Sequence, residues 1–211
     1  MPSTASSTHS FLPALGDGVP IVDHSTNAPK GVAARVTRLS GVRYLHAPVF
    51  MGPSNSKDAT GLMLVSGAPA LVDELRAALS TMTGKLIELG PEPDKAAKLK
   101  LTGNGLLIGL TGIMGDLFQM GRGADLSAED IMGLFSFFTP TAAGMGNRVL
   151  AAGSAPPSFE LTMARKDVRL MIEAAADRPL MVLPGIAAAM DKAIEAGQGA
   201  QDFAIVAAGK P

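Results

Sequence analysis

The chain has 211 residues, of which 47% are hydrophobic and 18% charged, so it can bury a sizeable core as one ordinary domain or two small ones. A formal net charge of −1 and an aromatic content of 4% argue against nucleic acid as a partner. The absence of cysteine excludes disulfides, thiolate metal sites and cysteine nucleophiles, and it suits a reducing cytoplasm.

Residues 1–14 form a polar N-terminal segment, and its first ten residues have neither the basic nor the apolar stretch of a secretory signal. A short strand is expected over Val19–Asp23, followed by a helix with Pro29 in its first turn and either Asn27 or Thr26 as its cap. The next apolar run, Tyr44–Val49, predicts a second strand. Strand, helix and strand at this spacing predict a βαβ unit with a right-handed crossover.

The following segment contains one further helix between two strands. A polar loop over 52–59 precedes a strand at Leu62–Val65, a helix at Ala70–Met82 and a strand at Lys85–Leu89. Residues 15–90 are therefore predicted to form an α/β domain.

Beyond Pro91 the pattern becomes helical throughout. Asp94 is expected to cap a helix that runs to about Met120, with Gly121 at its C-terminal end. Five further helices are expected at Ser127–Phe138, Ala142–Leu150, Leu161–Ala176, Leu180–Glu195 and Ala200–Val206. The predicted fold class is α/β followed by all-α, with residues 91–211 as the all-α domain.

The segment Leu101–Met120 is apolar and long enough to span a membrane. Asn104 and Asp116 lie within it, and an acidic side chain is costly inside a bilayer. Its glycines, among them Gly105 and Gly109, also suit a soluble helix that crosses another closely. We therefore expect a core helix and no membrane partner.

Lys100 and Asn104 lie four residues apart and share one face of this apolar helix. Burial of an ammonium is costly and lowers its pKa toward the range useful for acid–base catalysis, and a carboxamide beside it could orient a polar substrate. The alternative is that Lys100 extends to the surface while Asn104 satisfies the backbone. The residues alone leave both interpretations open.

Other familiar catalytic patterns fail on geometry. Asp23, His24 and Ser25 are the residue types of a hydrolase triad, but adjacent strand residues point to opposite faces. The three histidines have no metal-ligand spacing, so no metal site is expected. No G-x-G-x-x-G stands between a strand and a helix. Lys166 and Asp167, taken alone, are most simply part of a solvated helix face.

Five segments taken together resemble the β-hydroxyacid dehydrogenase family, which includes 3-hydroxyisobutyrate dehydrogenase and the glyoxylate and succinic semialdehyde reductases. They occur in the family's order, and the match runs over nearly the whole chain from about Leu15. The segments are 22–26 (VDHST) followed by Pro29, 43–49 (RYLHAPV) followed by Gly52, 61–67 (GLMLVSG), 100–104 (KLTGN) and 159–170 (FELTMARKDVRL).

The resemblance implies the C-terminal part of a Rossmann-type domain that binds NAD or NADP, followed by an all-helical domain like that of 6-phosphogluconate dehydrogenase. It implies that Lys100 is the catalytic general acid/base and that Asn104 binds the substrate. It also implies that Ser25 and Thr26 lie near the nicotinamide and that Lys166 borders the cofactor pocket. Members pair through the all-α domain, so a homodimer or higher homo-oligomer is expected.

Three departures from the family pattern qualify this expectation. In the substrate-binding segment, Phe50 and Met51 precede Gly52 where the family has Ser and Gly, which makes that corner smaller and more apolar. A bulkier or less carboxylate-like substrate is expected there, or none. Gly103 replaces the first Asn of a common Asn pair. The chain also begins where the family's Rossmann domain is more than half complete, which predicts N-terminal truncation and weak binding of NAD(H) or NADP(H).

The sequence thus predicts a cytoplasmic NAD(P)-dependent dehydrogenase or reductase that acts on a small β-hydroxyacid or the corresponding aldehyde or keto compound. The alternative is a catalytically inactive family member that serves as a helical dimerisation module.

Overall fold

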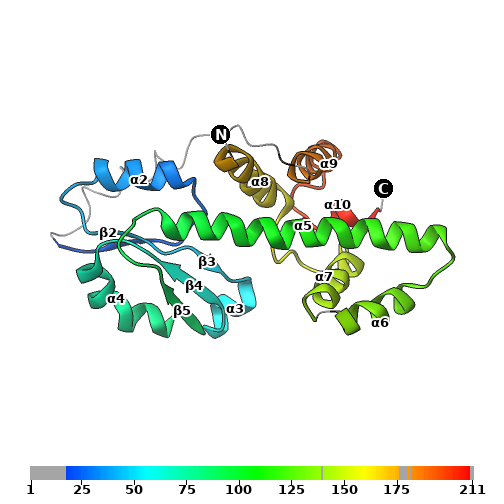
Figure 1. Cartoon of the computed structure of the whole chain (residues 1–211), viewed down its shortest axis with the longest axis horizontal. Coiled ribbons are helices and arrows are strands. Elements are labelled where there is room, and N and C mark those ends of the chain that lie inside the picture. The colour runs from blue at the N-terminus through cyan, green and yellow to red at the C-terminus, as the bar shows by residue number, and fades with distance from the viewer. Residues whose placement is uncertain (1–17, 139, 176–179, 181, 210–211) are drawn as a thin grey trace.

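The computed structural model of the protein describes residues 18–138, 140–175, 180 and 182–209, so the predicted polar segment 1–14 lies outside the described residues. One long helix, α5 (Lys95–Gly123), runs along the molecule (Figure 1). Its first turns lie against an α/β half, and the rest crosses a half made of helices (Figure 1).

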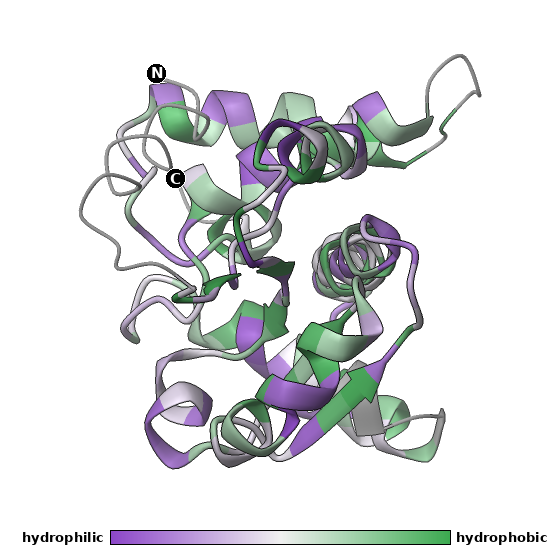
Figure 2. Ribbon diagram, turned by 90° about the vertical axis from the view of Figure 1, so that its left-hand side faces the viewer, coloured by the Kyte–Doolittle hydropathy of each residue, from purple (hydrophilic) through white to green (hydrophobic). Residues whose placement is uncertain are grey.

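The strands form two small ladders. In the first, β1 (Ile21–Asp23) pairs in parallel with β2 (Tyr44–His46). In the second, β3 (Val49–Phe50) is antiparallel to β4 (Leu62–Val65), which is parallel to β5 (Lys85–Glu88). Most strand residues are hydrophobic, as Figure 2 shows.

The expected single strand over Tyr44–Val49 is interrupted at Pro48, which has no backbone N–H for a ladder. Ala47 N still donates to Asp23 O of β1, whereas Pro48 O accepts from Leu64 N of β4. The chain changes partner strands here, so the residues after Pro48 are directed toward β4 and α5.

Three helices accompany the strands: α2 (Pro29–Arg38), α3 (Pro53–Asp58) and α4 (Pro69–Thr81). The loop expected over 52–59 was wrong, because α3 forms there, with a proline in its first turn and Gly52 N bonded to Asn55 Oδ1 at 3.2 Å. The expected cap of α2 was also wrong. Ala28 is the N-cap without a side-chain bond, and the Asn27 side chain bonds other polar groups.

The helical half follows α5, and beyond β5 the described residues contain no strand. Its helices are α6 (Ala128–Phe138), α7 (Pro140–Ala151), α8 (Leu161–Ala175), α9 (Leu183–Glu195) and α10 (Ile205–Ala208). The last helix is shorter and later than the expected Ala200–Val206. The expected C-terminal end of α5 at Gly121 was also wrong, because the helix continues for two more residues to Gly123.

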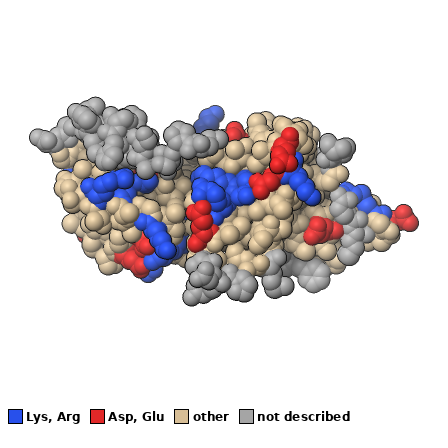
Figure 3. Space-filling view, turned by 90° about the horizontal axis from the view of Figure 1, so that it is seen from above, with Lys and Arg blue, Asp and Glu red and all other residues tan. Residues whose placement is uncertain are grey.

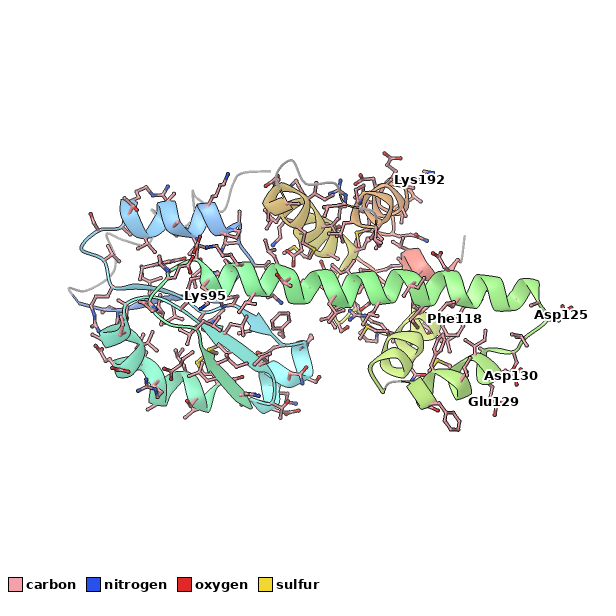
Figure 4. All side chains as sticks on the ribbon, viewed as in Figure 1. Lys95, Phe118, Asp125, Glu129, Asp130 and Lys192 are labelled. Atoms are coloured by element: carbon pink, nitrogen blue, oxygen red, sulfur yellow. The ribbon has the colours of Figure 1, made fainter. Side chains whose placement is uncertain are left out.

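Each half has its own apolar cluster. Leu45, Met63 and Val65 belong to the cluster of the α/β half. Ile108 and Phe118 of α5 belong to the cluster of the helical half. Phe118 points from α5 toward α6 and α7, where its ring centroid lies 5.9 Å from that of Phe135 (Figure 4).

By length and composition α5 could also cross a membrane, with a mean hydropathy of 1.2 in its most apolar window. About two fifths of that window (39%) is buried inside the protein. A core helix passes the same test. Of the glycines expected to allow a close crossing, Gly109 has nothing within 4 Å and Gly105 meets only Met171 Sδ at 3.6 Å, but Gly115 does lie at such a crossing. An added Cβ there would lie 2.6 Å from the backbone oxygen of Ala207, so α10 crosses α5 in close contact.

Candidate active site

The N-terminus of α5 is fixed by a residue of the α/β half. Ser66, directly after β4, accepts a hydrogen bond from Ala96 N at 2.9 Å and donates to Pro93 O at 3.3 Å. Asp94 is the N-cap residue of α5, as expected, but its side chain makes no bond to the helix backbone. The tertiary contact anchors the first turn of α5 at the end of β4, one turn before Lys100.

Lys100 and Asn104 are both buried, with 7% and 5% of their surfaces exposed. Lys100 Nζ donates to Asn104 Oδ1 at 2.8 Å, and Asn104 Nδ2 donates to Asp167 Oδ2 at 2.6 Å. The alternative in which Lys100 extends to the surface was therefore wrong. Asn104 links the lysine to a buried carboxylate on α8.

The face of the Phe50 ring covers Lys100, with Nζ 3.8 Å from the ring centroid. Burial lowers the pKa of Lys100 from 10.5 to about 8, although the negative charge of Asp167 acts in the opposite direction. A lysine with this pKa exchanges its proton near neutral pH, as a general acid or base must.

Asp167 is the functional residue that sequence reasoning missed. It is 2% exposed, so the solvated face expected for Lys166 and Asp167 was wrong for the carboxylate. Its position in α8 could have indicated this, because Ala164, Val168 and Met171 of the same face are also buried. Lys166 Nζ lies 3.0 Å from Asp167 Oδ1 and donates to Thr26 O at 3.3 Å.

Ser25 and Thr26 lie in the loop that leaves the carboxyl end of β1. Asp23 anchors this loop by accepting hydrogen bonds from Ser25 N at 3.0 Å and from Tyr44 Oη at 2.7 Å, and by pairing with Arg35 at 2.6 Å. Burial alone would raise the pKa of Asp23, but the hydrogen bonds from the Ser25 hydroxyl, the Tyr44 hydroxyl and Ser25 N lower it. These contacts position the loop, and Lys166 bonds to it at Thr26 O.

The histidines beside this loop have structural partners. His24 Nδ1 lies 2.7 Å from Ala47 O, away from the Asp23–Ser25 contact, so the three residues do not form a triad. His46 Nε2 lies 3.0 Å from Ser25 O, and burial lowers the pKa of His46. No group of three possible metal ligands occurs in the part of the chain that the structure describes.

The structure brings some of the predicted site residues together and separates others. Phe50 and Asn104 contact Lys100 directly. Asn104 also bonds Asp167, which lies beside Lys166. Lys166 in turn donates to the backbone oxygen of Thr26. Met51 instead packs into the α/β cluster and against Gly61. Gly52 is the N-cap of α3.

Two cavities of about 790 Å³ each flank α5, and neither is lined by the predicted site residues. One lies among α2, α5 and α8, and the other among α5, α9 and α10. Gly105 and Leu183 line both cavities.

Comparison with known proteins finds solved structures of similar overall fold. No protein-family model and no curated sequence matches the chain. A structure of Psf3 in complex with NADP+ and 2-OPP is 20% identical, with a TM-score of 0.83 over 97% of this chain and 76% of that one. The 3-hydroxyisobutyrate dehydrogenase of Mycobacterium tuberculosis with L-serine gives 20% and 0.81, over 98% and 76%.

The chain has the 3-hydroxyisobutyrate dehydrogenase fold. The predicted fold class, the end of a Rossmann-type domain followed by a helical domain, is confirmed. A more distant likeness is to an imine reductase of Myxococcus stipitatus with NAD+, at 21% identity and a TM-score of 0.52 over 90% of this chain and 70% of that one.

Proposed function

We propose that this protein is an NAD(P)-dependent oxidoreductase that interconverts a small β-hydroxyacid, or a related alcohol, with the corresponding aldehyde or keto compound. The observation that carries the proposal is the buried Lys100, whose pKa is lowered to about 8 and whose ammonium is held by Asn104. The fold shared with Psf3 and 3-hydroxyisobutyrate dehydrogenase supports the same class of chemistry.

In the direction of reduction, Lys100 Nζ donates a proton to the carbonyl oxygen as negative charge develops on it. Asn104 accepts a hydrogen bond from Nζ, and Asp167 fixes the orientation of the Asn104 amide. The Lys100 side chain is therefore held in one orientation. In the direction of oxidation, neutral Lys100 accepts the proton of the alcohol. The nicotinamide cofactor supplies or accepts the hydride when bound.

The residues on the Lys166 side fit the nicotinamide end of such a cofactor. Ser25 and Thr26 follow the carboxyl end of a parallel strand, where ligands of Rossmann-type folds bind. Ser25 is exposed, and Lys166 is half-buried between this loop and Asp167. We propose that these three residues contact the cofactor. The described strand-to-helix turns contain no glycine-rich loop for the pyrophosphate.

We further propose a division into an α/β domain over 15–90 and an all-α domain over 91–211, supported by the two separate apolar clusters. We also propose that the protein is a soluble cytoplasmic homo-oligomer. Leu99, Leu106 and Ile113 of α5 support the oligomer, because these large apolar residues recur every seven positions and are 42–62% exposed.

The test is aldehyde-dependent oxidation of NADH or NADPH by the full chain, measured at millimolar cofactor with Lys100→Met and a matched control, Lys57→Met. Lys57 is exposed on α3. We expect Lys100→Met to lower kcat by at least about 100-fold, the usual size of a lost general acid. Lys57→Met should match the parent. A parent without turnover, or a Lys100→Met variant within about threefold of it, would contradict the assignment.

The second candidate function is a helical dimerisation module without catalysis, favoured by the exposed α5 residues. It predicts a stable oligomer with no turnover in the same assay, so the two functions are distinguished directly.

A further inference from the structure

Phe50 and Lys100 come from different halves of the molecule and meet face to face. Phe50 ends β3, whereas Lys100 lies in the second turn of α5. The ammonium has the Phe50 ring 3.8 Å away and Asn104 Oδ1 at 2.8 Å. The ring therefore occupies one approach to the proposed proton donor.

The Phe50 ring is seated against the backbone of α5 at Gly103. A Cβ at Gly103 would lie 2.5 Å from Phe50 Cζ and 2.9 Å from Cε1, much closer than real Cβ contacts. The ring thus fills the space between Lys100 and the backbone of α5 at Gly103.

The space beside the Phe50 ring is an unfavourable environment for a negatively charged group. Phe50 is uncharged, and the face of an aromatic ring carries partial negative charge. The neighbouring ammonium of Lys166 already lies 3.0 Å from Asp167 Oδ1. A carboxylate placed beside the ring would lose its hydration and face the negative side of the ring. The nearby cations are engaged elsewhere, because Lys166 pairs with Asp167 and Lys100 Nζ is needed by the substrate oxygen in the proposed function.

We propose that Phe50 is a specificity-determining residue: it admits to Lys100 a carbonyl compound whose chain is uncharged and apolar, and it rejects one whose chain carries a carboxylate. This inference rests on the proposed function, in which Lys100 protonates the substrate oxygen. Of the substrates in the proposed function, it excludes the β-hydroxyacids and keeps the related neutral alcohols with the corresponding aldehydes and ketones.

The first experiment compares kcat/KM for pentanal and for 4-oxobutanoate, which differ chiefly in the terminal carboxylate. The full chain is assayed beside Phe50→Ser, which opens the corner, and Phe50→Leu, which keeps it apolar and filled. We expect the parent and Phe50→Leu to prefer pentanal by at least about tenfold, and Phe50→Ser to reduce that preference to about threefold or less. Equal preferences in the parent and Phe50→Ser would overturn the inference.

The second experiment needs no turnover. Acetylation of Lys100 by neutral N-hydroxysuccinimidyl acetate and by its sulfonated, anionic analogue is measured by peptide mass spectrometry, with exposed Lys57 as the internal standard. With each rate divided by that of Lys57, the neutral reagent should label Lys100 of the parent at least about fivefold faster than the anionic reagent does, because a buried apolar approach disfavours an anion. Phe50→Ser should remove the difference, and Phe50→Leu should keep it.

The two experiments separate the possible failures. No discrimination in the parent overturns the inference, even if Phe50→Ser does not fold. Charge discrimination at Lys100 without turnover of either aldehyde overturns the proposed function and supports Phe50 as a charge-selective wall. Turnover with a preference for 4-oxobutanoate supports the proposed function and overturns the role of Phe50.

Discussion

At the scale of single residues, the chemistry depends on a chain of contacts from Lys100 through Asn104 to Asp167. Each member determines the state of the next: the carboxylate fixes the amide, and the amide holds the ammonium. The spacing of Lys100 and Asn104 on one helix face was visible in the sequence. The link to Asp167, 63 positions away in the chain, was not.

The pH dependence of turnover should report Lys100. Because burial lowers its pKa to about 8, reduction, which needs the ammonium, should decline as the pH rises through about 8. Oxidation, which needs the neutral amine, should increase over the same range. Asp167→Asn removes the charge that raises this pKa, so both inflections should move to lower pH. Rate profiles in both directions measure this, and an inflection that stays or rises in the variant would contradict it.

Gly103 should tolerate a side chain only when Phe50 is absent. We expect Gly103→Ala to destabilise the parent by about 1–3 kcal/mol through overpacking against the ring. In a Phe50→Ala background the same change should stabilise by up to about 1 kcal/mol, the helix propensity of alanine over glycine. Urea unfolding of the four proteins measures the coupling. Additive effects would show that the ring and the glycine are independent.

At the scale of elements, α5 connects the two halves, and its glycines have different surroundings. A Cβ would meet Ala207 at Gly115 and nothing within 4 Å at Gly109. Gly115 thus belongs to a close helix crossing, whereas Gly109 has open space beside it. The sequence shows two equivalent helical glycines, and only the packing tells them apart.

Alanine substitutions at these two glycines should have opposite effects. Gly115→Ala should lower the free energy of unfolding by about 1–3 kcal/mol, because α10 must move away. Gly109→Ala should raise it by up to about 1 kcal/mol. Thermal unfolding at equal protein concentration measures both. A destabilising Gly109→Ala would indicate that another helix approaches α5 there.

At the scale of the whole molecule, basic and acidic side chains lie next to each other on the face seen in Figure 3. No single-sign surface dominates that view. The exposed apolar residues of α5, Leu99, Leu106 and Ile113, are a more specific surface feature, since they form a stripe that the described chain covers only in part. A second copy of the chain is the occupant that we propose for it.

Leu106→Glu should weaken this association. Leu106 is 62% exposed at the centre of the stripe, so the change costs the single chain little but places a charge in a contact between copies. Sedimentation at tens of micromolar should show an oligomer for the parent and a smaller species for the variant. Leu134→Glu on α6, where Leu134 is 55% exposed, is the matched control and should leave the oligomer intact. A monomeric parent would contradict the prediction.

The sequence by itself determined the features that depend on local periodicity and on motif order. These include the change from α/β to all-α near Pro91, most helices and strands, and the Lys100–Asn104 pair on a buried helix. Such features follow from hydrophobic spacing and from residues close together in the chain.

Only the tertiary structure decided the contacts between distant segments. The side chain of Ser66, and not that of the N-cap residue Asp94, bonds the first turn of α5. Asp167 meets Asn104, and the Phe50 ring packs on Gly103. Each contact joins residues at least 30 positions apart, and no local pattern encodes which distant side chain satisfies a buried polar group or fills the space above a glycine. Packing of the two halves around α5 supplies that information, because it brings these partners within contact distance.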